Sequence, residues 1–228
     1  QRYISPYLVD GYKFDFRLYI LISKVNPFTV YLYEDGLARF CSAPYVAPNR
    51  ENLSNLFSHL TNTAVNIKSE DNQNICRLAS EVLQSIPNNP QLWNKIKQVV
   101  ALTMIALLPQ IIHNIDLYSL NSRETKKKIP NPPQPFLQPI DRYFHICGID
   151  ILLSHRCEPF VLELNDRPSL SVTFPIEQSL KTNMIFDALK VMYTKELGGW
   201  QQILPPPDSS LYNTVLSQIQ QQALKGIK

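Results

Sequence analysis

Apolar and polar residues alternate along the first part of the chain, which is the pattern of strands with one buried face. Residues 13–22 alternate most regularly, and their apolar face is made up of Phe14, Phe16, Leu18, Ile20 and Ile22. Residues 28–33 form the next apolar run, and Asp35-Gly36 predicts a tight hairpin before a third strand over residues 36–41. We therefore predict an antiparallel meander over residues 1–42.

The other face of this meander is charged, with Lys13, Asp15 and Arg17 on one strand and Arg39 on another. A row of plus, minus and plus is most often a solvated exterior. It is equally suited to a site that binds polyphosphate and carboxylate groups, and the pattern leaves both interpretations open.

Helical spacing replaces alternation in the middle of the chain. Residues 74–86 predict a short helix, and Asn89-Pro90 predicts the start of a longer one. Along that helix we predict a core-packing stripe consisting of Trp93, Ile96, Val100, Met104, Leu107, Ile111 and Ile115. Pro109 predicts a local kink or end of the helix. Residues 59–66 fit neither pattern, and their Thr and Asn side chains are suited to cap a turn or to bind a ligand.

Two apolar strands close to residue 155 predict a hairpin with polar groups on one face. The first strand carries Asp150 and the second carries Glu163 and Asn165, and an even loop over residues 154–157 would place Asp150 opposite Val161. Two carboxylates and an amide on an apolar sheet repel one another unless a cation lies among them, and such ligands suit magnesium. A pair of solvent-facing acids on an edge hairpin explains the pattern equally well.

Composition narrows the class of protein. Apolar residues make up 44% of the 228 residues, which is enough for a sizeable core, and a net charge of +3 argues against a dedicated nucleic-acid binder. The four cysteines lack metal-ligand spacing, which favours buried thiols in a reduced compartment. We find no secretory signal and expect no apolar run of transmembrane length. The chain begins at Gln1 without a methionine, so we expect it to be an internal piece of a protein.

Connectors rich in proline or glycine set the expected boundaries. Residues 119–139 contain three consecutive lysines and several prolines, and they predict a loop without packed structure. Residues 196–228 predict a proline-rich connector followed by a polar helix over residues 209–225. We therefore expect one domain over residues 1–195, made up of residues 1–118, the loop, and a hairpin with a helix over residues 140–195.

Several short motifs of the chain occur together in one family, in the family's order and at plausible spacing. They are Gln1-Arg2-Tyr3-Ile4, Lys13-Phe14-Asp15-Phe16-Arg17, residues 31–40, His59-Leu60-Thr61-Asn62, residues 148–153, Glu163-Leu164-Asn165 and Pro168-Ser169-Leu170. Each motif is weak alone, and together they are specific. On these motifs the sequence resembles the tubulin tyrosine ligase-like proteins. The resemblance implies an α+β, ATP-grasp-like fold, with antiparallel sheets and packed helices, over residues 1–195.

The resemblance also implies roles for individual residues. ATP would be bound by Gln1, Arg2, Tyr3, Ile4, Lys13, Phe14, Asp15, Thr61 and Asn62, the first four holding the adenine largely through backbone groups. The amino-acid substrate would be bound by Arg39, Thr63, Ala64, Arg77 and Lys181. Arg17 and Arg39 would be the catalytic residues. Two magnesium ions are expected, and the residues that would hold them are Asp150, Glu163 and Asn165.

The chemistry implied by the resemblance is ATP-dependent ligation of an amino acid to a protein carboxylate through an acyl phosphate. Glutamate is the expected amino acid, and tubulin or another protein with an acidic tail is the expected acceptor. We expect a cytoplasmic monomer associated with the cytoskeleton or cilia, without nucleic-acid or membrane partners. The alternatives are a non-catalytic module that binds acidic tails and a structural α+β protein with a solvated acidic hairpin.

Three positions depart from the family pattern. Ala64 stands where a hydroxyl is often found, Arg77 stands about where a lysine is often found, and Asp166-Arg167 replaces smaller residues after the asparagine. These departures leave the expected metal ligands intact and put the identity of the amino acid in doubt. The family's glycine-rich phosphate loop precedes the adenine segment, so we expect this chain alone to bind Mg-ATP weakly and not to ligate.

Overall fold

The computed structural model describes residues 3–25, 27–70, 74–126 and 144–206, and for residues 115–126 it describes the backbone alone. The C-terminal helix predicted over residues 209–225, most of the predicted loop over residues 119–139, and the adenine-binding candidates Gln1 and Arg2 lie outside the described residues.

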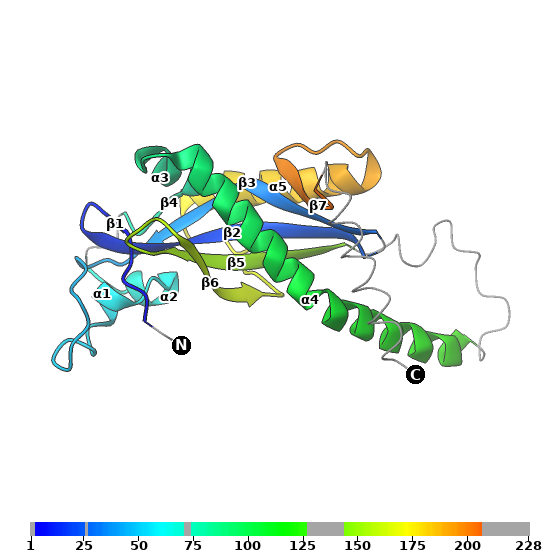
Figure 1. Cartoon of the computed structure of the whole chain (residues 1–228), viewed down its shortest axis with the longest axis horizontal. Helices are drawn as coiled ribbons and strands as arrows, with labels where there is room; N and C mark the ends of the chain where they lie inside the picture. Colours follow the sequence, from blue (N-terminus) through cyan, green and yellow to red (C-terminus); the bar gives the residue numbers. More distant parts are fainter. Residues whose placement is uncertain (1–2, 26, 71–73, 127–143, 207–228) are drawn as a thin grey trace.

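A seven-stranded antiparallel sheet forms the centre of the molecule (Figure 1). Its two longest strands, β2 (Tyr12–Val25) and β3 (Phe28–Phe40), pair along most of their length. On the other side of β2 lies β5 (His145–Leu153), followed by β6 (Pro159–Asn165), and β4 (Cys76–Leu78) flanks β3. Two short strands complete the sheet: β1 (Leu8–Val9) pairs with β2, and β7 (Trp200–Leu204) pairs with β3.

Helices cover both faces of this sheet. The two faces of β2 therefore contribute side chains to two separate hydrophobic cores. The even-numbered residues of β2 pack with α3 (Ala79–Ser85) and α4 (Asn89–Lys126), which crosses one face of the sheet diagonally (Figure 1). The odd-numbered residues Tyr19 and Leu21 pack with α5 (Pro175–Tyr193) on the other face. The prediction of an α+β fold with an antiparallel sheet and packed helices is confirmed.

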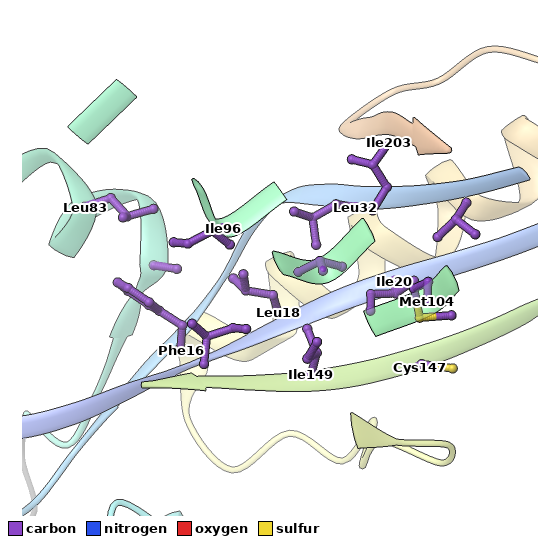
Figure 2. Close-up of a cluster of buried hydrophobic side chains, with 14 of the residues drawn as sticks. Phe16, Leu18, Ile20, Leu32, Leu83, Ile96, Met104, Cys147, Ile149 and Ile203 are labelled. Atoms are coloured by element: carbon purple, nitrogen blue, oxygen red, sulfur yellow. The ribbon is translucent and has the colours of Figure 1, made fainter. Parts of the chain in front are cut away.

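Figure 2 shows the larger core, in which strand and helix side chains interdigitate. Phe16, Leu18 and Ile20 of β2 are 0% exposed and belong to one cluster with Ile149 of β5 and the α4 residues Ile96 and Met104. Burying each of these side chains contributes about 1.5–3 kcal/mol. This packing holds β2, β3 and β5 in one register, which fixes the positions of the polar side chains on the opposite face.

The hairpin predicted at Asp35-Gly36 is wrong, because β3 runs from Phe28 to Phe40 without a turn. The strand bulges instead, and its register against β2 moves from Leu18↔Gly36 to Ile20↔Leu32. The Asp35 carboxylate accepts hydrogen bonds from the backbone N–H groups of Gly36 at 2.7 Å and Ser80 at 2.9 Å, which anchors α3 to the strand. A side chain at position 36 would collide with the carbonyl oxygen of Arg17, so the glycine permits the strands to approach.

In the helical region, two predicted boundaries differ from those in the structure. Residues 76–78 form β4 rather than helix, because they pair with residues 37–39 of β3. The loop predicted from residue 119 begins later, because α4 continues through Pro109 to Lys126. The buried stripe of α4 shares only Ile96, Val100 and Met104 with the predicted one. Leu92, Leu108 and Ile112 are its other buried members, whereas the predicted Trp93, Leu107 and Ile111 are partly buried against the same core. The side chain of Ile115 lies outside the described residues.

Within α4, Asn89–Asn114 is long and apolar enough to cross a membrane by length and composition, because it contains an 18-residue window with a mean hydropathy of 1.5. The expectation that no apolar run reaches this length is therefore wrong. The test is weak evidence for a membrane span, because the core helix of a soluble protein also passes it. In this fold the buried stripe of α4 packs on the sheet.

The β5–β6 hairpin forms as predicted, with one change of register. Asp150 lies opposite Glu163 rather than Val161, because a bulge separates the Asp150↔Glu163 pair from the Ile151↔Val161 pair. The bulge lets Val161 pack into the larger core while Glu163 lies beside Asp150 on the opposite face. The predicted common face of Asp150, Glu163 and Asn165 is thereby retained.

Candidate functional site

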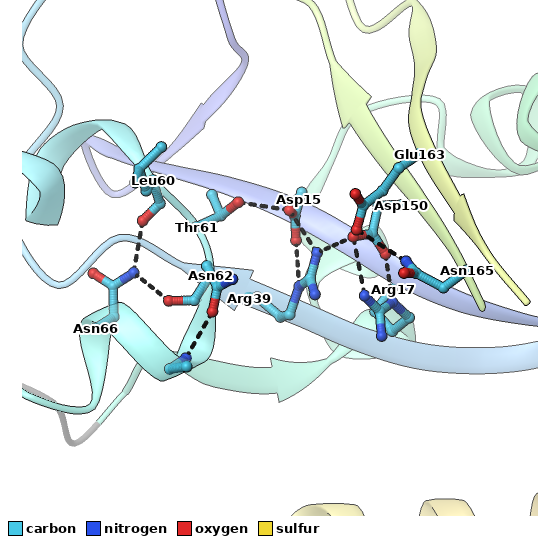
Figure 3. Close-up of polar contacts among 11 residues, drawn as sticks. Asp15, Arg17, Arg39, Leu60, Thr61, Asn62, Asn66, Asp150, Glu163 and Asn165 are labelled. Atoms are coloured by element: carbon cyan, nitrogen blue, oxygen red, sulfur yellow. Dashed lines mark hydrogen bonds and ion pairs between the residues drawn. The ribbon is translucent and has the colours of Figure 1, made fainter. Parts of the chain in front are cut away.

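A row of alternating charges crosses three neighbouring strands on the sheet face opposite α4 (Figure 3). Asp15 of β2 is the cross-strand partner of Arg39 of β3, and Arg17 of β2 is the partner of Asp150 of β5. Because partners in a ladder project to the same side, the register alone brings the four side chains together. Asp15 and Asp150 are only 2% and 3% exposed, so their charges depend on these neighbours.

Two bidentate ion pairs and one bridging bond join the row. Arg39 donates through Nε and Nη2 to the two carboxylate oxygens of Asp15, at 2.7 and 2.8 Å. Arg17 holds Asp150 in the same way, through Nε to Oδ1 and through Nη2 to Oδ2, the latter at 3.0 Å. Arg39 Nη2 also donates to Asp150 Oδ2 at 2.7 Å. Neither Nη1 group has a partner among the described residues, so Arg39 keeps two N–H donors and Arg17 keeps three for a bound anion.

The pKa values follow from this arrangement. Burial acts to raise the pKa of Asp150, but the hydrogen bonds from Arg17 and the charge of Arg39 outweigh it and lower that pKa below the ordinary value. Burial acts to lower the pKa of Arg39, and the charge and hydrogen bonds of Asp15 outweigh it and raise that pKa. Asp150 and Arg39 are therefore both charged at neutral pH.

The loop before α2 (Thr63–Asn66) meets the same row. The Thr61 hydroxyl donates to Asp15 Oδ2 at 2.5 Å and is 8% exposed. Lys13 Nζ donates to the carbonyl oxygen of His59 at 2.6 Å, at the end of α1 (Leu56–His59). The predicted site residues Asp15 and Thr61 are thus in direct contact, and Lys13 contacts the same loop two residues before Thr61.

Beside Asp150 lie the remaining oxygen donors of the predicted metal site. Glu163 is the cross-strand partner of Asp150, and Asn165 Nδ2 donates to Glu163 Oε1 at 2.9 Å, which leaves the amide oxygen of Asn165 available. Among the described residues, no group of three or more His, Cys, Asp or Glu side chains could hold a metal by itself. Two carboxylates and one amide oxygen nevertheless fit magnesium, which usually takes one or two carboxylates together with substrate phosphates.

Other predicted site residues lie near this row without joining it. The side chain of Asn62 caps α2 by accepting from the backbone N–H of Ala64 at 2.8 Å, next to Thr63. Lys181 is buried on α5, where its Nζ donates to the carbonyl oxygen of Ser171 and pairs with Glu177 at 3.3 Å. These residues flank the site, and their contacts are internal to the fold.

Two of the predicted residues, Phe14 and Arg77, point to the other face of the sheet, and Tyr3 contacts a loop residue. Phe14 is 1% exposed and stacks on Phe40 in the larger core, so its side chain faces away from the charged row. Arg77 lies on that same far face, with its guanidinium 4.4 Å from the centre of the Phe40 ring, because its strand partner is Ala38. Tyr3, which precedes Ile4 in the chain, is half exposed. Its hydroxyl forms a hydrogen bond with the hydroxyl of Tyr45 at 2.8 Å.

The family model for the tubulin-tyrosine ligase family matches residues 1–198, which is most of the chain and includes the whole charged row. The chain belongs to the tubulin-tyrosine ligase family. Among similar proteins, a probable beta-tubulin polyglutamylase of Tetrahymena thermophila is 35% identical over 84% of the chain. The human tubulin polyglutamylases TTLL13 and TTLL7 are 34% and 32% identical over the same share. The chain spans 16%, 23% and 22% of the length of these three relatives, respectively.

One residue of this tubulin-tyrosine ligase family member was not predicted from the sequence. Asn66 is 0% exposed, and its side chain binds the segment that carries Thr61. Nothing in the local pattern distinguishes it from a surface turn residue, because its other partner, Ser42, is distant in the sequence.

Proposed function

We propose that this chain supplies part of an ATP-dependent ligase that adds an amino acid, glutamate in the first place, to a carboxylate of a protein tail, with tubulin as the acceptor. The observation that supports it most is the charged row Asp15, Arg39, Asp150 and Arg17, with Glu163 beside it. This charged row lies on one face of the sheet, and the chain is a member of the tubulin-tyrosine ligase family. The names of the relatives support tubulin as acceptor and glutamate as substrate.

In the proposed reaction, an oxygen of the acceptor carboxylate attacks the γ-phosphorus of ATP. The bond to the β,γ-bridging oxygen breaks, and ADP leaves with that electron pair. The amine nitrogen of the free amino acid then attacks the acyl carbon and expels inorganic phosphate, and the nitrogen loses a proton to water. The products are an amide, ADP and phosphate, and no covalent bond to the enzyme is needed.

The charged row and Lys13 perform three tasks in this scheme. Lys13 and Arg17 lie on the strand that would follow the nucleotide, and they offset the negative charge of the transferring phosphoryl group. Arg39, which keeps two free N–H donors at Nη1, binds a carboxylate of the incoming amino acid or the developing oxyanion. Asp15 holds Arg39 in place through two bonds at 2.7 and 2.8 Å, so this donor is oriented before substrate arrives.

Asp150, Glu163 and Asn165 are the residues that would hold magnesium. When bound, the metal supplies positive charge to the phosphates and holds them in line for displacement. Asp150 already accepts three hydrogen bonds from Arg17 and Arg39. A carboxylate has roughly four acceptor positions, so a further one remains for a cation. Glu163 is exposed and has room to turn toward a ligand.

The proposed function implies a protein of the cytoplasm, at the cytoskeleton or in cilia, that works as a monomer and needs no nucleic acid or membrane. The experiment that tests it is incorporation of labelled glutamate, glycine or tyrosine into tubulin by the natural protein that carries this sequence. We expect ATP-dependent incorporation of glutamate, and we expect Glu163→Gln to abolish it, because the change removes charge with little change of shape. Binding of tubulin without incorporation of any of the three would favour the non-catalytic binding module.

A further inference from the structure

Asn66, the last residue of α2, is a buried polar side chain that the proposed mechanism does not use. Its Oδ1 accepts hydrogen bonds from the backbone N–H of Ser42 at 2.8 Å and from the Ser42 hydroxyl at 2.9 Å. Its Nδ2 donates to the carbonyl oxygens of Leu60 at 2.6 Å and Asn62 at 3.0 Å (Figure 3). Both donors and both lone pairs of the amide are thereby used, and the reversed amide would leave the Ser42 backbone N–H and the carbonyl oxygens of Leu60 and Asn62 without a matching partner.

These four bonds join two segments that both belong to the candidate site. Leu60 and Asn62 are the immediate neighbours of Thr61, whose hydroxyl donates to Asp15. Ser42 comes shortly after the end of β3, which is the strand that carries Arg39. Arg39 donates to the same Asp15 carboxylate that Thr61 contacts. Asn66 is therefore the link between the two elements that hold Asp15.

We propose that Asn66 is a positioning residue for the nucleotide-binding side of the site. By holding the carbonyl groups on both sides of Thr61, it keeps the Thr61 hydroxyl at hydrogen-bonding distance from Asp15. Thr61 in turn fixes the carboxylate that orients Arg39. Asn66 touches no substrate in this scheme and acts through Thr61 and Asp15. The inference rests on the proposed function, because it assigns Asp15 and Thr61 to an ATP site.

A variant that breaks one side of the link separates positioning from folding. Asn66→Asp keeps an oxygen for the two bonds from Ser42. It replaces the donor NH₂ by an oxygen that faces the carbonyl groups of Leu60 and Asn62 and is repelled by them. Ser58→Ala is the matched control: Ser58 is also 0% exposed in the neighbouring helix α1, but its hydroxyl donates to the carbonyl oxygen of Asn55 at 3.2 Å and does not reach Thr61.

The test compares these variants in the natural protein, by the Kd for Mg-ATP, the KM for ATP and for glutamate, and the midpoint of unfolding. We expect Asn66→Asp to raise the Kd and KM for ATP about tenfold, which corresponds to ~1.4 kcal/mol, and to raise the KM for glutamate as well, because Asp15 also orients Arg39. Ser58→Ala is expected to lower the midpoint of unfolding and to leave the KM for ATP unchanged. If Asn66→Asp also lowered the midpoint of unfolding and left the Kd and KM for ATP unchanged, the proposal would be overturned.

A second variant tests the same link without altering Asn66. Thr61→Val removes the hydroxyl that reaches Asp15 and keeps the shape of the side chain, so we expect the same rise in the KM for ATP. A double variant with Asn66→Asp should be no worse than the stronger single variant, because both act on one path. A Thr61→Val protein with the wild-type Kd for Mg-ATP overturns the proposal, whether or not Asn66→Asp folds. Wild-type protein that binds Mg-ATP but incorporates no amino acid defeats the proposed function alone, since the ATP affinities can still be compared.

Discussion

Removing Arg39 tests how strongly the charged row depends on its own ion pairs. Arg39→Met deletes both bonds to Asp15 and the bond to Asp150, and it keeps an unbranched side chain of similar length. Asp15, which is 2% exposed, is then left with the Thr61 hydroxyl as its described side-chain partner. Breaking a buried ion pair in this way costs about 3–5 kcal/mol, because the remaining charge stays buried without a counterion.

An exposed ion pair in the same protein provides the matched control. Lys95 and Glu158 are also close, at 2.6 Å, but their side chains are 47% and 50% exposed. Lys95→Met should cost about 0–1 kcal/mol, as is usual for surface pairs. The assay is urea unfolding at neutral pH, with the free energy of unfolding taken from the midpoint and slope.

A thermodynamic cycle identifies the cause of the expected loss. Asp15→Asn in the Arg39→Met background removes the buried charge, so the double variant should be more stable than Arg39→Met alone. Arg39→Met with a cost no greater than that of Lys95→Met would refute the argument that the row is held by buried ion pairs. Additive losses in the double variant would refute the assignment of that cost to the Asp15 charge.

Two further predictions concern the same sheet. The pKa of Asp150 is lowered in the folded protein, so its stabilising contribution is present above the unfolded pKa, about 3.9, and is lost as the pH falls through the folded pKa. Urea unfolding between neutral and acid pH should therefore show the difference between wild type and Asp150→Asn shrinking as the pH falls, and a difference that grows would contradict this sign. Gly36→Ala should lower the free energy of unfolding by about 1–3 kcal/mol, because the added methyl meets the Arg17 carbonyl oxygen, and an unchanged unfolding midpoint would contradict that close approach.

Alternation was sufficient to predict β2, apolar runs were sufficient to predict β5 and β6, and both gave the common face of the charged side chains. In β2, Phe16 and Arg17 point to opposite faces because neighbouring residues in a strand must do so. That rule does not depend on contacts with other parts of the chain. The common face of Asp150 and Glu163 was also predicted, although the predicted register was wrong by a bulge that no local pattern signals.

The features that could not be predicted depend on contacts distant in the sequence. Asp35-Gly36 has the composition of a hairpin turn, but the Asp35 carboxylate holds the start of α3 and the strand continues past it. Arg77 resembled a substrate ligand in sequence, and pairing with Ala38 places it on the other face of the sheet. The role of Asn66 requires knowing that residues 42, 60 and 62 meet around it.

The most direct test of the proposed reaction is to follow one oxygen atom during ligation. If the acceptor carboxylate of a tubulin tail peptide is labelled with oxygen-18, attack on the γ-phosphorus transfers one labelled oxygen into the phosphate that is later released. Mass spectrometry of the products should show one labelled oxygen in inorganic phosphate for each amide formed, and neither product with Glu163→Gln. Amide formation that leaves the phosphate unlabelled would contradict the acyl-phosphate route and the role proposed for the charged row.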